Sequence, residues 1–543
     1  MTLPRHLVRF IDIRPRLALV LLCLALWLPG LFTLPPTDRD ESRFAQATSQ
    51  MLRTGDFVRI MNGTAARNKK PIGIYWLQAP FAAAARQAGL ARQNPIWPYR
   101  LPTLLGGIAA VLATFAAGET LFADRRAALA AAAMLAACVL LTVEAHIAKT
   151  DAALLGATTV AMAVLARAWR GVKLRPAGAA LFWLALGAGI LIKGPITPMV
   201  VGLTALSATL ASRQAAWLRA LRPAWGAVLL CLVVLPWFVA IGLATHGAFF
   251  SDALGSDLAR KLGAAEESHA GFPGEHLVLL PLLVFPAVVP VLGGLVAGWQ
   301  ARRGAAETFL MCWLIPGWLV FEAVPTKLPH YPLPLYPALF LLAGAWLARP
   351  AQLAMPRWVR LGGGALLGAA AFILGAAAVA LPIALGAPAW LGVPAAVAAA
   401  ATGWLAGTGR FAASLVAASV LYAGILQLDL PSIPALWLAP RVAAALRQNC
   451  PACAPDGAGL VAAGYAEPSL MFLVGAHLAY RPDGRSAARA LAAGRSAALV
   501  EQAYLAGFLV ESARLGLRPR AAATIDGFNY SRGKPARLTL FVS

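Results

Sequence analysis

Apolar runs long enough to cross a lipid bilayer recur along this chain and constrain its fold more than any other feature. A membrane-spanning helix needs about 20 mostly apolar residues. Of the 543 residues, 60% are hydrophobic and 13% are charged, a composition typical of integral membrane proteins. The runs lie at 17–34, 101–122, 127–144, 152–169, 178–192, 196–211, 224–243, 276–299, 305–323, 332–348, 359–382, 389–407 and 411–428. We therefore expect a mainly α, polytopic membrane protein of about thirteen transmembrane helices.

The distribution of basic residues predicts the orientation of these spans. Arg5, Arg9, Arg14 and Arg16 precede the first span, and no small-residue cleavage motif follows it, so we expect a retained signal anchor. Alternate connections carry clusters of arginine and lysine, as cytoplasmic loops do: Arg125–Arg126, Arg170/Lys173/Arg175, Arg213/Arg219/Arg222, Arg302–Arg303, Arg349/Arg357/Arg360 and Arg410. We expect a multi-pass protein of the cell inner membrane with a cytoplasmic N-terminus and a periplasmic C-terminal domain.

The net charge of +23 would also suit a nucleic-acid-binding protein. No soluble basic domain and no surface of interleaved aromatic and basic residues accompanies it. Orientation signals and anionic lipids account for the charge better, so we expect the lipid bilayer as a partner and no nucleic acid.

The hydrophobic pattern changes near residue 430, which divides the chain into two predicted domains. Residues 1–429 form a transmembrane module whose long first outward loop is 35–100, and residues 430–543 form a small periplasmic α/β domain. Strand-like runs at 459–465, 469–474 and 538–542 alternate with helix-like stretches at 484–493 and 500–515. Cys450 and Cys453 are expected to form a disulfide outside the cytoplasm rather than a redox or zinc site.

Ionisable residues gather in the loops that face outward. The candidates are Asp40, Glu41, Arg43, Lys69 and Lys70 in the first loop; Glu144, His146, Lys149 and Asp151 in the second; Lys193 in the third; Arg260, Lys261, Glu266, Glu267, His269 and Glu275 in the fourth; and Lys327 and His330 in the fifth. Charges at membrane depth are costly, and their recurrence on one side indicates a functional site.

Each of these residues also has a structural explanation. Asp40 and Glu41 would favour the N-terminus of an amphipathic helix over 42–52, and Asp151 would cap the span that follows it. The lysines would extend from span ends toward water, and the histidines would form ordinary loop hydrogen bonds. The recurrence of Lys in Pro/Gly-containing turns on one face favours the functional explanation for the group.

Carboxylates that face several lysines suit a reaction with an anionic leaving group. A sugar linked to a lipid phosphate is such a substrate, because lysine and arginine stabilise the departing phosphate by charge-assisted hydrogen bonds. The acceptor needs one carboxylate that takes its proton. A nucleotide-sugar donor is disfavoured, because no Gly-rich phosphate-binding loop is present.

The first loop, with DESRFAQATSQMLRTGDF (40–57) followed by KPIGIYW (70–76), resembles bacterial lipid-linked-sugar glycosyltransferases of the GT-C fold. Among these enzymes it resembles the protein-mannosyltransferase-like family (types 39 and 83), which includes the lipid A aminoarabinose transferases. Lys193-Gly-Pro195 and TKLPHYPLPLYP (326–337) look like motifs of that family, and the resemblance extends from about residue 17 to 348. In the tail, GYAEPSLMFLVG (464–475) and DGFNYSRGK (526–534) are similar to the periplasmic domain of some members.

The resemblance implies roles for individual residues. Asp40 would be the essential carboxylate near the acceptor, supported by Glu41, and Asp151 would be a second acidic site residue. Arg43 and Lys70 would hold the lipid phosphate, and three residues of the fifth loop would close its pocket: Lys327, His330 and Tyr331. We add the cations Lys69 and Lys193 to the phosphate-binding set.

The resemblance implies an enzyme that transfers a sugar from a polyprenyl phosphate to an envelope glycolipid such as lipid A on the periplasmic face. A protein O-glycosyltransferase with the same donor is the alternative. A lipid-linked-sugar flippase is the alternative from another class, but it would show mid-span charges and corresponding broken helices in two repeats. A non-catalytic assembly protein would keep its function without the first-loop acids.

One position departs from the family pattern. Aminoarabinose transferases carry a glutamate immediately before this Lys-Pro, as a metal ligand, and here Lys69 stands there. A protonated lysine has no lone pair for a metal, so no cofactor is firmly expected and a divalent metal is in doubt. His269 and Glu275 are the remaining metal-ligand candidates.

If the Lys69 ammonium replaces the metal, Lys69→Glu should make sugar transfer depend on a divalent cation. The measurement is transfer activity with and without a chelator, in the wild-type and variant proteins. Activity that a chelator leaves unchanged in both proteins would contradict this hypothesis.

Overall fold

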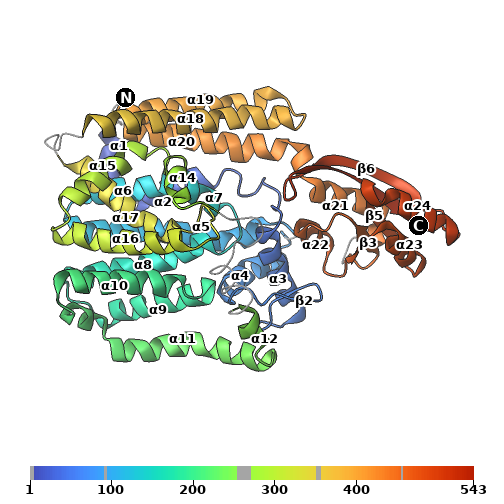
Figure 1. Cartoon of the computed structure of the whole chain (residues 1–543), viewed down its shortest axis with the longest axis horizontal. Helices are drawn as coiled ribbons and strands as arrows, with labels where there is room; N and C mark the ends of the chain where they lie inside the picture. The colour runs from blue at the N-terminus through green and yellow to red at the C-terminus, as the bar shows by residue number, and fades with distance from the viewer. Residues whose placement is uncertain (1–4, 91–93, 254–270, 350–355, 454–456) are drawn as a thin grey trace.

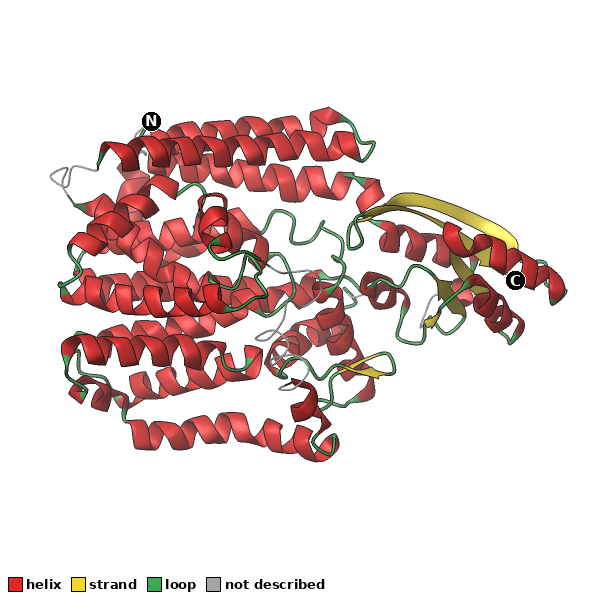
Figure 2. Ribbon diagram, in the orientation of Figure 1, coloured by secondary structure: helices red, strands yellow, loops and turns green. Residues whose placement is uncertain are grey.

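A bundle of long helices, a loop layer at one end of it and a mixed α/β domain beyond that layer make up the structure, which is a computed structural model (Figure 1). It describes residues 5–90, 94–253, 271–349, 356–453 and 457–543. In Figure 2 almost all of the sheet lies in the domain at the right, and the bundle is helical.

Eight helices in the described ranges are long and apolar enough to cross a membrane. They are α5 (Trp97–Phe122), α8 (Asp151–Trp169), α9 (Pro176–Lys193), α11 (Pro223–Ala244), α16 (Ala305–Ala323), α18 (Arg357–Ala384), the helix Ala389–Gly407 that contains α19 (Val393–Gly407), and the helix Phe411–Ser432 that begins with α20 (Phe411–Ala423). The chain is therefore a multi-pass membrane protein.

Shorter or bent helices occupy the other predicted spans. Helices α6 (Arg125–Ala137) and α7 (Val139–Ala145) are bent by 60° and together are long enough for one span. The shorter apolar helices are α2 (Pro15–Trp27), α10 (Ile196–Ser212), α15 (Val288–Gln300) and Leu333–Ala348, which contains α17 (Tyr336–Ala348). Every predicted span overlaps a helix, and the total of about thirteen crossings remains a prediction.

Small residues let the central helices approach closely. A Cβ added at Gly106 of α5 would lie 2.5 Å from the Cα of Ala153 in α8, and one at Gly156 would lie 2.6 Å from the carbonyl oxygen of Gly106. Only glycine permits backbone-to-backbone packing of this kind, which is common between membrane helices. The contact fixes the first turn of α8, where Asp151 lies.

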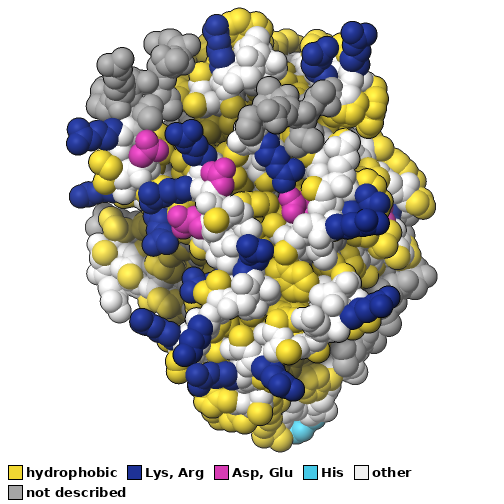
Figure 3. Space-filling model, turned by 90° about the vertical axis from the view of Figure 1, so that its left-hand side faces the viewer, with side chains coloured by type: hydrophobic (Ala, Val, Ile, Leu, Met, Phe, Trp, Pro, Cys, Tyr) yellow, Lys and Arg dark blue, Asp and Glu magenta, His cyan; other side chains and the backbone are white. Residues whose placement is uncertain are grey.

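The connections between helices separate by charge. Exposed arginines and lysines occupy the turns after α5, α8, α10 and α15, as the sequence predicted, and Figure 3 shows many Lys and Arg side chains and few Asp or Glu side chains at that end of the bundle. The first loop and the C-terminal domain lie at the opposite end (Figure 1). The bundle thus has one basic end and one end that carries the loops.

The first outward loop folds into two helices. Helix α3 (Asp40–Thr54) begins at the acidic pair, includes the predicted amphipathic helix over 42–52, and ends at Gly55 in a left-handed conformation (φ 72°). Helix α4 (Gly73–Gln87) follows in the same loop. A Cβ at Gly73 would lie 2.6 Å from the carbonyl carbon of Leu191 near the end of α9. This close contact brings the Lys69–Lys70 segment beside Lys193.

A buried ion pair joins this loop to the bundle. The Glu41 carboxylate accepts hydrogen bonds from Arg100 Nε (2.8 Å) and a second guanidinium nitrogen (3.0 Å), and both side chains are fully buried. The backbone N–H groups of Thr37 and Ala148 also donate to Glu41, each at 2.8 Å. Both carboxylate oxygens are therefore satisfied, which is the condition for a buried charge to be tolerated.

The C-terminal domain is α/β, as predicted, with a five-stranded sheet in the order β4-β3-β5-β7-β6. Strands β3 (Leu460–Ala463), β4 (Ala479–Arg481) and β5 (Ala497–Glu501) are parallel, and β6 (Arg520–Asn529) and β7 (Lys534–Val542) are antiparallel. Side chains of α21 (Leu438–Asn449) and α22 (Pro468–Val474) share one core with the sheet, and those of α23 (Gly484–Ala492) and α24 (Gln502–Arg514) share another.

Comparison with the predicted elements identifies one error in this domain. The segment 469–474 was expected to be a strand but forms α22, because Pro468 favours the first turn of a helix and Leu470 and Val474 bury one helical face. The helices expected at 484–493 and 500–515 are confirmed within a few residues, and Cys450 and Cys453 form the predicted disulfide.

Arg100→Ala should destabilise the folded protein by about 3–5 kcal/mol, because it leaves the Glu41 carboxylate buried without its cation. Thermal unfolding of the detergent-solubilised protein measures the change. The control is Arg59→Ala, which breaks an exposed pair with Asp56 (2.7 Å) and should cost about 1 kcal/mol or less. Equal shifts in the two variants would contradict the importance of the buried pair.

Candidate functional site

Asp40 is the first residue of α3, and its carboxylate lies near cationic side chains of the first loop. Arg67 lies 3.6 Å and Arg43 3.8 Å from its Oδ1, and its side chain keeps 61% of its accessible surface although loops surround it. Desolvation acts to raise the pKa of Asp40, but the charges of Arg67, Arg43, Lys149 and Lys70 outweigh it and hold this pKa below its usual range. Asp40 is therefore an accessible carboxylate that is ionised at neutral pH.

Arg67, which was not among the predicted site residues, is held beside Asp40. Its guanidinium stacks on the Phe44 ring at 4.8 Å, and its Nε donates to the Tyr75 hydroxyl at 3.3 Å. Phe44 and Tyr75 belong to α3 and α4, so the two loop helices together fix this cation. The sequence signal that could have identified Arg67 is its position, three residues before Lys70 in the same basic segment.

A second cluster of charges joins three other loops. Lys149 Nζ lies 3.0 Å from Glu144 Oε1 and 3.6 Å from Asp151 Oδ2, and Lys193 Nζ lies 2.5 Å from Asp151 Oδ1. Burial alone would lower the pKa of Lys149, but the Glu144 and Asp151 carboxylates raise it above its ordinary value. Glu144 and Lys149 were noted in the second loop but not placed in the predicted catalytic set.

His330 and Tyr331 complete this cluster. The His330 ring lies between the carboxylates, with Nε2 3.7 Å from Asp151 and Nδ1 3.8 Å from Glu144. Burial lowers the pKa of His330 to about 3, and the Asp151 carboxylate only partly opposes this shift, so the imidazole is neutral at physiological pH. The Lys193 ammonium lies 5.6 Å from the centre of the Tyr331 ring.

A cavity of about 700 Å³ opens beside this cluster. Its polar wall contains the predicted residues Lys69, Lys70, Asp151, Lys193, His330 and Tyr331. Its other walls are apolar and come from α8–α11, the segment after α11, α16 and the turn before α17, and they include Leu154, Met199, Phe238, Phe249, Phe250, Val320 and Phe321. The cavity is therefore amphipathic, because its lining combines cations with aromatic and aliphatic side chains.

The environment of Asp40 links it electrostatically to this cavity. Lys149 and Lys70 both contribute to the lowered pKa of Asp40, and the Asp40 carboxylate acts in turn on His330. Charges shift the pKa of another group in this way only when the groups are close, so Asp40 lies near the polar wall of the cavity. The structure thus brings together the first-, second-, third- and fifth-loop residues that the sequence singled out separately.

Three predicted residues are placed differently. Arg43, expected at the lipid phosphate, lies 3.8 Å from Asp40 and is not among the cavity-lining residues. Glu41, expected among the catalytic groups, is buried and holds Arg100 rather than facing the cavity. Lys327, expected at the lipid phosphate, donates to the carbonyls of Glu322 (2.7 Å) and Val324 (2.9 Å), and it is not among the cavity-lining residues. Its ammonium stabilises the loop that presents His330.

The predicted metal ligands form no site in the part of the chain that the structure describes. His269 lies outside the described residues, and Glu275 lies beside Gly271 and Lys327. No group of three or more His, Cys, Asp or Glu residues within the described ranges is arranged to hold a metal. The carboxylates of Glu144 and Asp151 are each paired with a lysine ammonium, which does not fit a divalent cation at that place.

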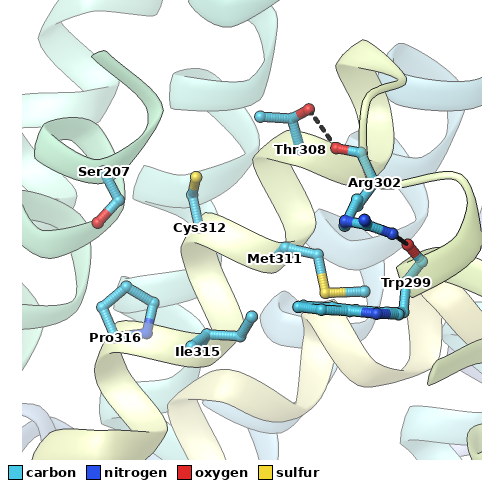
Figure 4. A pocket seen from close by; sticks show the side chains of 8 residues that line it. All are labelled: Ser207, Trp299, Arg302, Thr308, Met311, Cys312, Ile315 and Pro316. Carbon is cyan, nitrogen blue, oxygen red and sulfur yellow. Dashed lines mark hydrogen bonds between the residues drawn. The ribbon is translucent and has the colours of Figure 1, made fainter. Parts of the chain in front are cut away.

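A second hollow, of about 280 Å³, lies toward the basic end between α10 and α16 (Figure 4). Arg302 stacks on Trp299 there at 4.8 Å, while Cys312, Ile315 and Pro316 form its apolar part. It contains none of the predicted site residues and lies apart from the cavity of the loop end.

The helical bundle and its loop-end cavity define a membrane protein with the GT-C fold, and comparisons with solved structures agree. ArnT from Cupriavidus metallidurans bound to undecaprenyl phosphate is similar with a TM-score of 0.72 and 21% identity over 96% of this chain and 97% of that one. The Archaeoglobus fulgidus oligosaccharyltransferase is more distantly similar, with a TM-score of 0.53 and 13% identity over 90% of this chain and 69% of that one.

Sequence comparisons find similarity to the same family, so the resemblance noted in the first loop is confirmed. The dolichyl-phosphate-mannose-protein mannosyltransferase family model matches residues 13–248. The undecaprenyl phosphate-alpha-4-amino-4-deoxy-L-arabinose arabinosyl transferase of Pseudomonas aeruginosa (strain LESB58) is 28% identical over 335 residues, or 60% of this chain. The Pectobacterium carotovorum enzyme of the same name is 25% identical over 57% of this chain. The matches span 59% and 54% of the lengths of these two relatives.

The neutral state of His330 predicts a specific effect of acid on stability. Because its pKa is about 3 in the folded protein and about 6.5 when exposed, His330 favours folding above pH 6.5, and this contribution is lost progressively as the pH falls toward 3. Between pH 6.5 and 4.5, the wild type should therefore lose more thermal stability than His330→Gln. Parallel losses in the two proteins would show that His330 is not held neutral.

Proposed function

We propose that the protein is an integral membrane glycosyltransferase that takes a sugar from a polyprenyl-phosphate donor. The observation that carries this proposal is the amphipathic cavity, whose apolar walls suit a prenyl chain and whose lysines suit a phosphate. The similarity to ArnT, which was solved with undecaprenyl phosphate, supports the same donor class.

Lys70, Lys193 and Lys69 act on the leaving phosphate. In the transfer step the bond between the anomeric carbon and the phosphate oxygen breaks, and the polyprenyl phosphate departs with the electron pair. Ammonium groups stabilise the charge that develops on that oxygen, and they act strongly because the cavity is largely apolar. The neutral His330 and the Tyr331 hydroxyl can contribute hydrogen bonds without adding charge.

Asp40 acts on the acceptor. An acceptor oxygen forms the new bond to the anomeric carbon, and its proton passes to the Asp40 carboxylate. The lowered pKa of Asp40 keeps the carboxylate ionised at neutral pH, so it is ready to orient the acceptor and receive that proton. Arg67 and Arg43 hold the carboxylate in place and lie where an anionic donor or acceptor would approach.

We assign Glu41 a positioning role in place of the catalytic one expected from the sequence, because its oxygens are engaged by Arg100 and backbone N–H groups. Asp151 positions Lys193 and Lys149 at the polar wall. Since the paired carboxylates do not fit a divalent ion, no step is assigned to a metal. We propose that the Lys69 ammonium supplies the positive charge that the metal would bring.

We propose the periplasmic face of the inner membrane as the place of reaction and an envelope glycolipid such as lipid A as the acceptor. The basic turns opposite the site support this orientation, as does the Cys450–Cys453 disulfide, which is typical of compartments outside the cytoplasm. A secreted protein is the alternative acceptor, because the oligosaccharyltransferase structure is also similar.

Asp40→Asn should reduce sugar transfer by about 100-fold or more while the protein still inserts and binds donor, because an amide cannot take the acceptor proton. Turnover of purified protein with a polyprenyl-phosphate sugar measures the effect. Asp56→Asn, at the turn after α3, is the matched control and should retain wild-type turnover. Retained activity in Asp40→Asn would remove this residue from the mechanism.

Mass spectrometry of envelope glycolipids from cells with and without the gene identifies the acceptor. We expect a glycolipid species heavier by one sugar that disappears with the gene and returns with the wild-type copy but not with Asp40→Asn. Unchanged glycolipids with a lost protein glycan would favour the alternative acceptor. Unchanged glycolipids and proteins, together with altered movement of the donor across the membrane, would favour the flippase.

A further inference from the structure

Two sequence motifs of the tail meet the first loop directly beside Asp40. The backbone N–H of Asp38 donates to the Tyr530 hydroxyl at 2.7 Å, and the backbone N–H of Ser469 donates to Asp38 Oδ1 at 3.3 Å. The Arg39 guanidinium donates to the Ser531 carbonyl. Residues separated by more than 400 positions thus contact the two residues that precede the proposed catalytic carboxylate, and α22 lies against α3 (Figure 1).

The backbone at this contact is strained. Arg39, the residue before α3, has φ 65° and ψ −111°, a conformation that non-glycine residues rarely adopt. Such a conformation costs about 1–3 kcal/mol and persists only where surrounding contacts impose it. Its side chain makes no capping hydrogen bond to α3, so the contacts of Asp38 and Arg39 with the C-terminal domain carry the constraint.

The C-terminal domain makes a rigid support for those contacts. Tyr530 lies in the turn between β6 and β7, and its ring contacts Trp437 with centroids 6.5 Å apart. Asn529, just before it, donates to the buried Glu467 carboxylate at 2.9 Å, which ties the turn to the segment that leads into α22. The turn that touches Asp38 is therefore fixed by a ring contact and a buried hydrogen bond.

We infer that this turn of the C-terminal domain, through Tyr530 and Ser531, clamps the strained Asp38–Arg39 backbone and so aims the Asp40 carboxylate at the site. Tyr530 is a positioning residue for the transfer reaction, and this role rests on the proposed function. Without the clamp the chain before α3 relaxes to an ordinary conformation, and the Asp40 carboxylate moves relative to Arg67 and Arg43.

The test is Tyr530→Phe, which keeps the ring against Trp437 and removes only the hydroxyl. Tyr504→Phe is the matched control, because Tyr504 lies in α24 and packs with the core on the other side of the sheet. Hydrogen exchange of the peptide that covers residues 36–44 reports the clamp directly in the full-length detergent-solubilised protein. Turnover of a polyprenyl-phosphate sugar reports its effect on Asp40.

We expect faster exchange in residues 36–44 and a kcat about 5–10-fold lower in Tyr530→Phe, with the donor KM unchanged because the donor cavity is not touched. Tyr504→Phe should match the wild type in both measurements. Unchanged exchange, unchanged kcat, or equal losses in the two variants would overturn the inference. If Tyr530→Phe does not reach the membrane, Arg39→Ala, which removes the contact with Ser531, is measured in the same way.

The two measurements separate the inference from the proposed function. Absence of transfer in the wild type, with exchange that still responds to Tyr530→Phe, would refute the proposed function and with it the catalytic purpose of the clamp, while the clamp itself would stand. Normal wild-type transfer with no response to Tyr530→Phe would refute only the clamp.

Discussion

The buried ion pair between Glu41 and Arg100 is the interaction on which the rest of the site depends. Arg100 also donates to the carbonyls of Leu31, Leu34 and Pro35, so one guanidinium joins the end of the first span, the start of α3 and the start of α5. A buried charge without its partner here would cost several kcal/mol, so Glu41 and Arg100 must both be in place for these three segments to pack together. Asp40 directly precedes Glu41 in the chain and takes its position from this junction.

The neighbouring acids show how burial divides roles among similar residues. Glu41 is surrounded by donors and therefore holds the structure, whereas Asp40 keeps an open side chain, as the proposed role at the acceptor requires. Asp151 is between these extremes, because it lines the cavity but is bound by two lysines. The cavity joins this polar wall to apolar surfaces from several helices, and a substrate with a charged head and a hydrocarbon tail matches both.

Much of this organisation was predictable from the sequence. Each predicted span overlaps a helix, because hydrophobic length is a strong local signal, and the loops that carry Asp40, Lys70, Asp151, Lys193 and His330 do converge. The roles of Glu41 and Lys327 were not predictable, since they depend on the partners Arg100, Glu322 and Val324. Tyr530 was missed because its contact with Asp38 joins residues 492 positions apart. Arg67 was missed because its partners Asp40, Phe44 and Tyr75 are brought to it only by the packing of α3 against α4.

The central claim is that cations from separate loops bind the phosphate of a prenyl-linked sugar in the amphipathic cavity. The most direct measurement is a cryo-electron microscopy structure of the purified protein with a polyprenyl phosphate. The account predicts the phosphate within about 4 Å of Lys70 and Lys193, with the prenyl chain against Phe238 and Phe250. A phosphate bound elsewhere, with this cavity empty or filled by another segment of the protein, would contradict it.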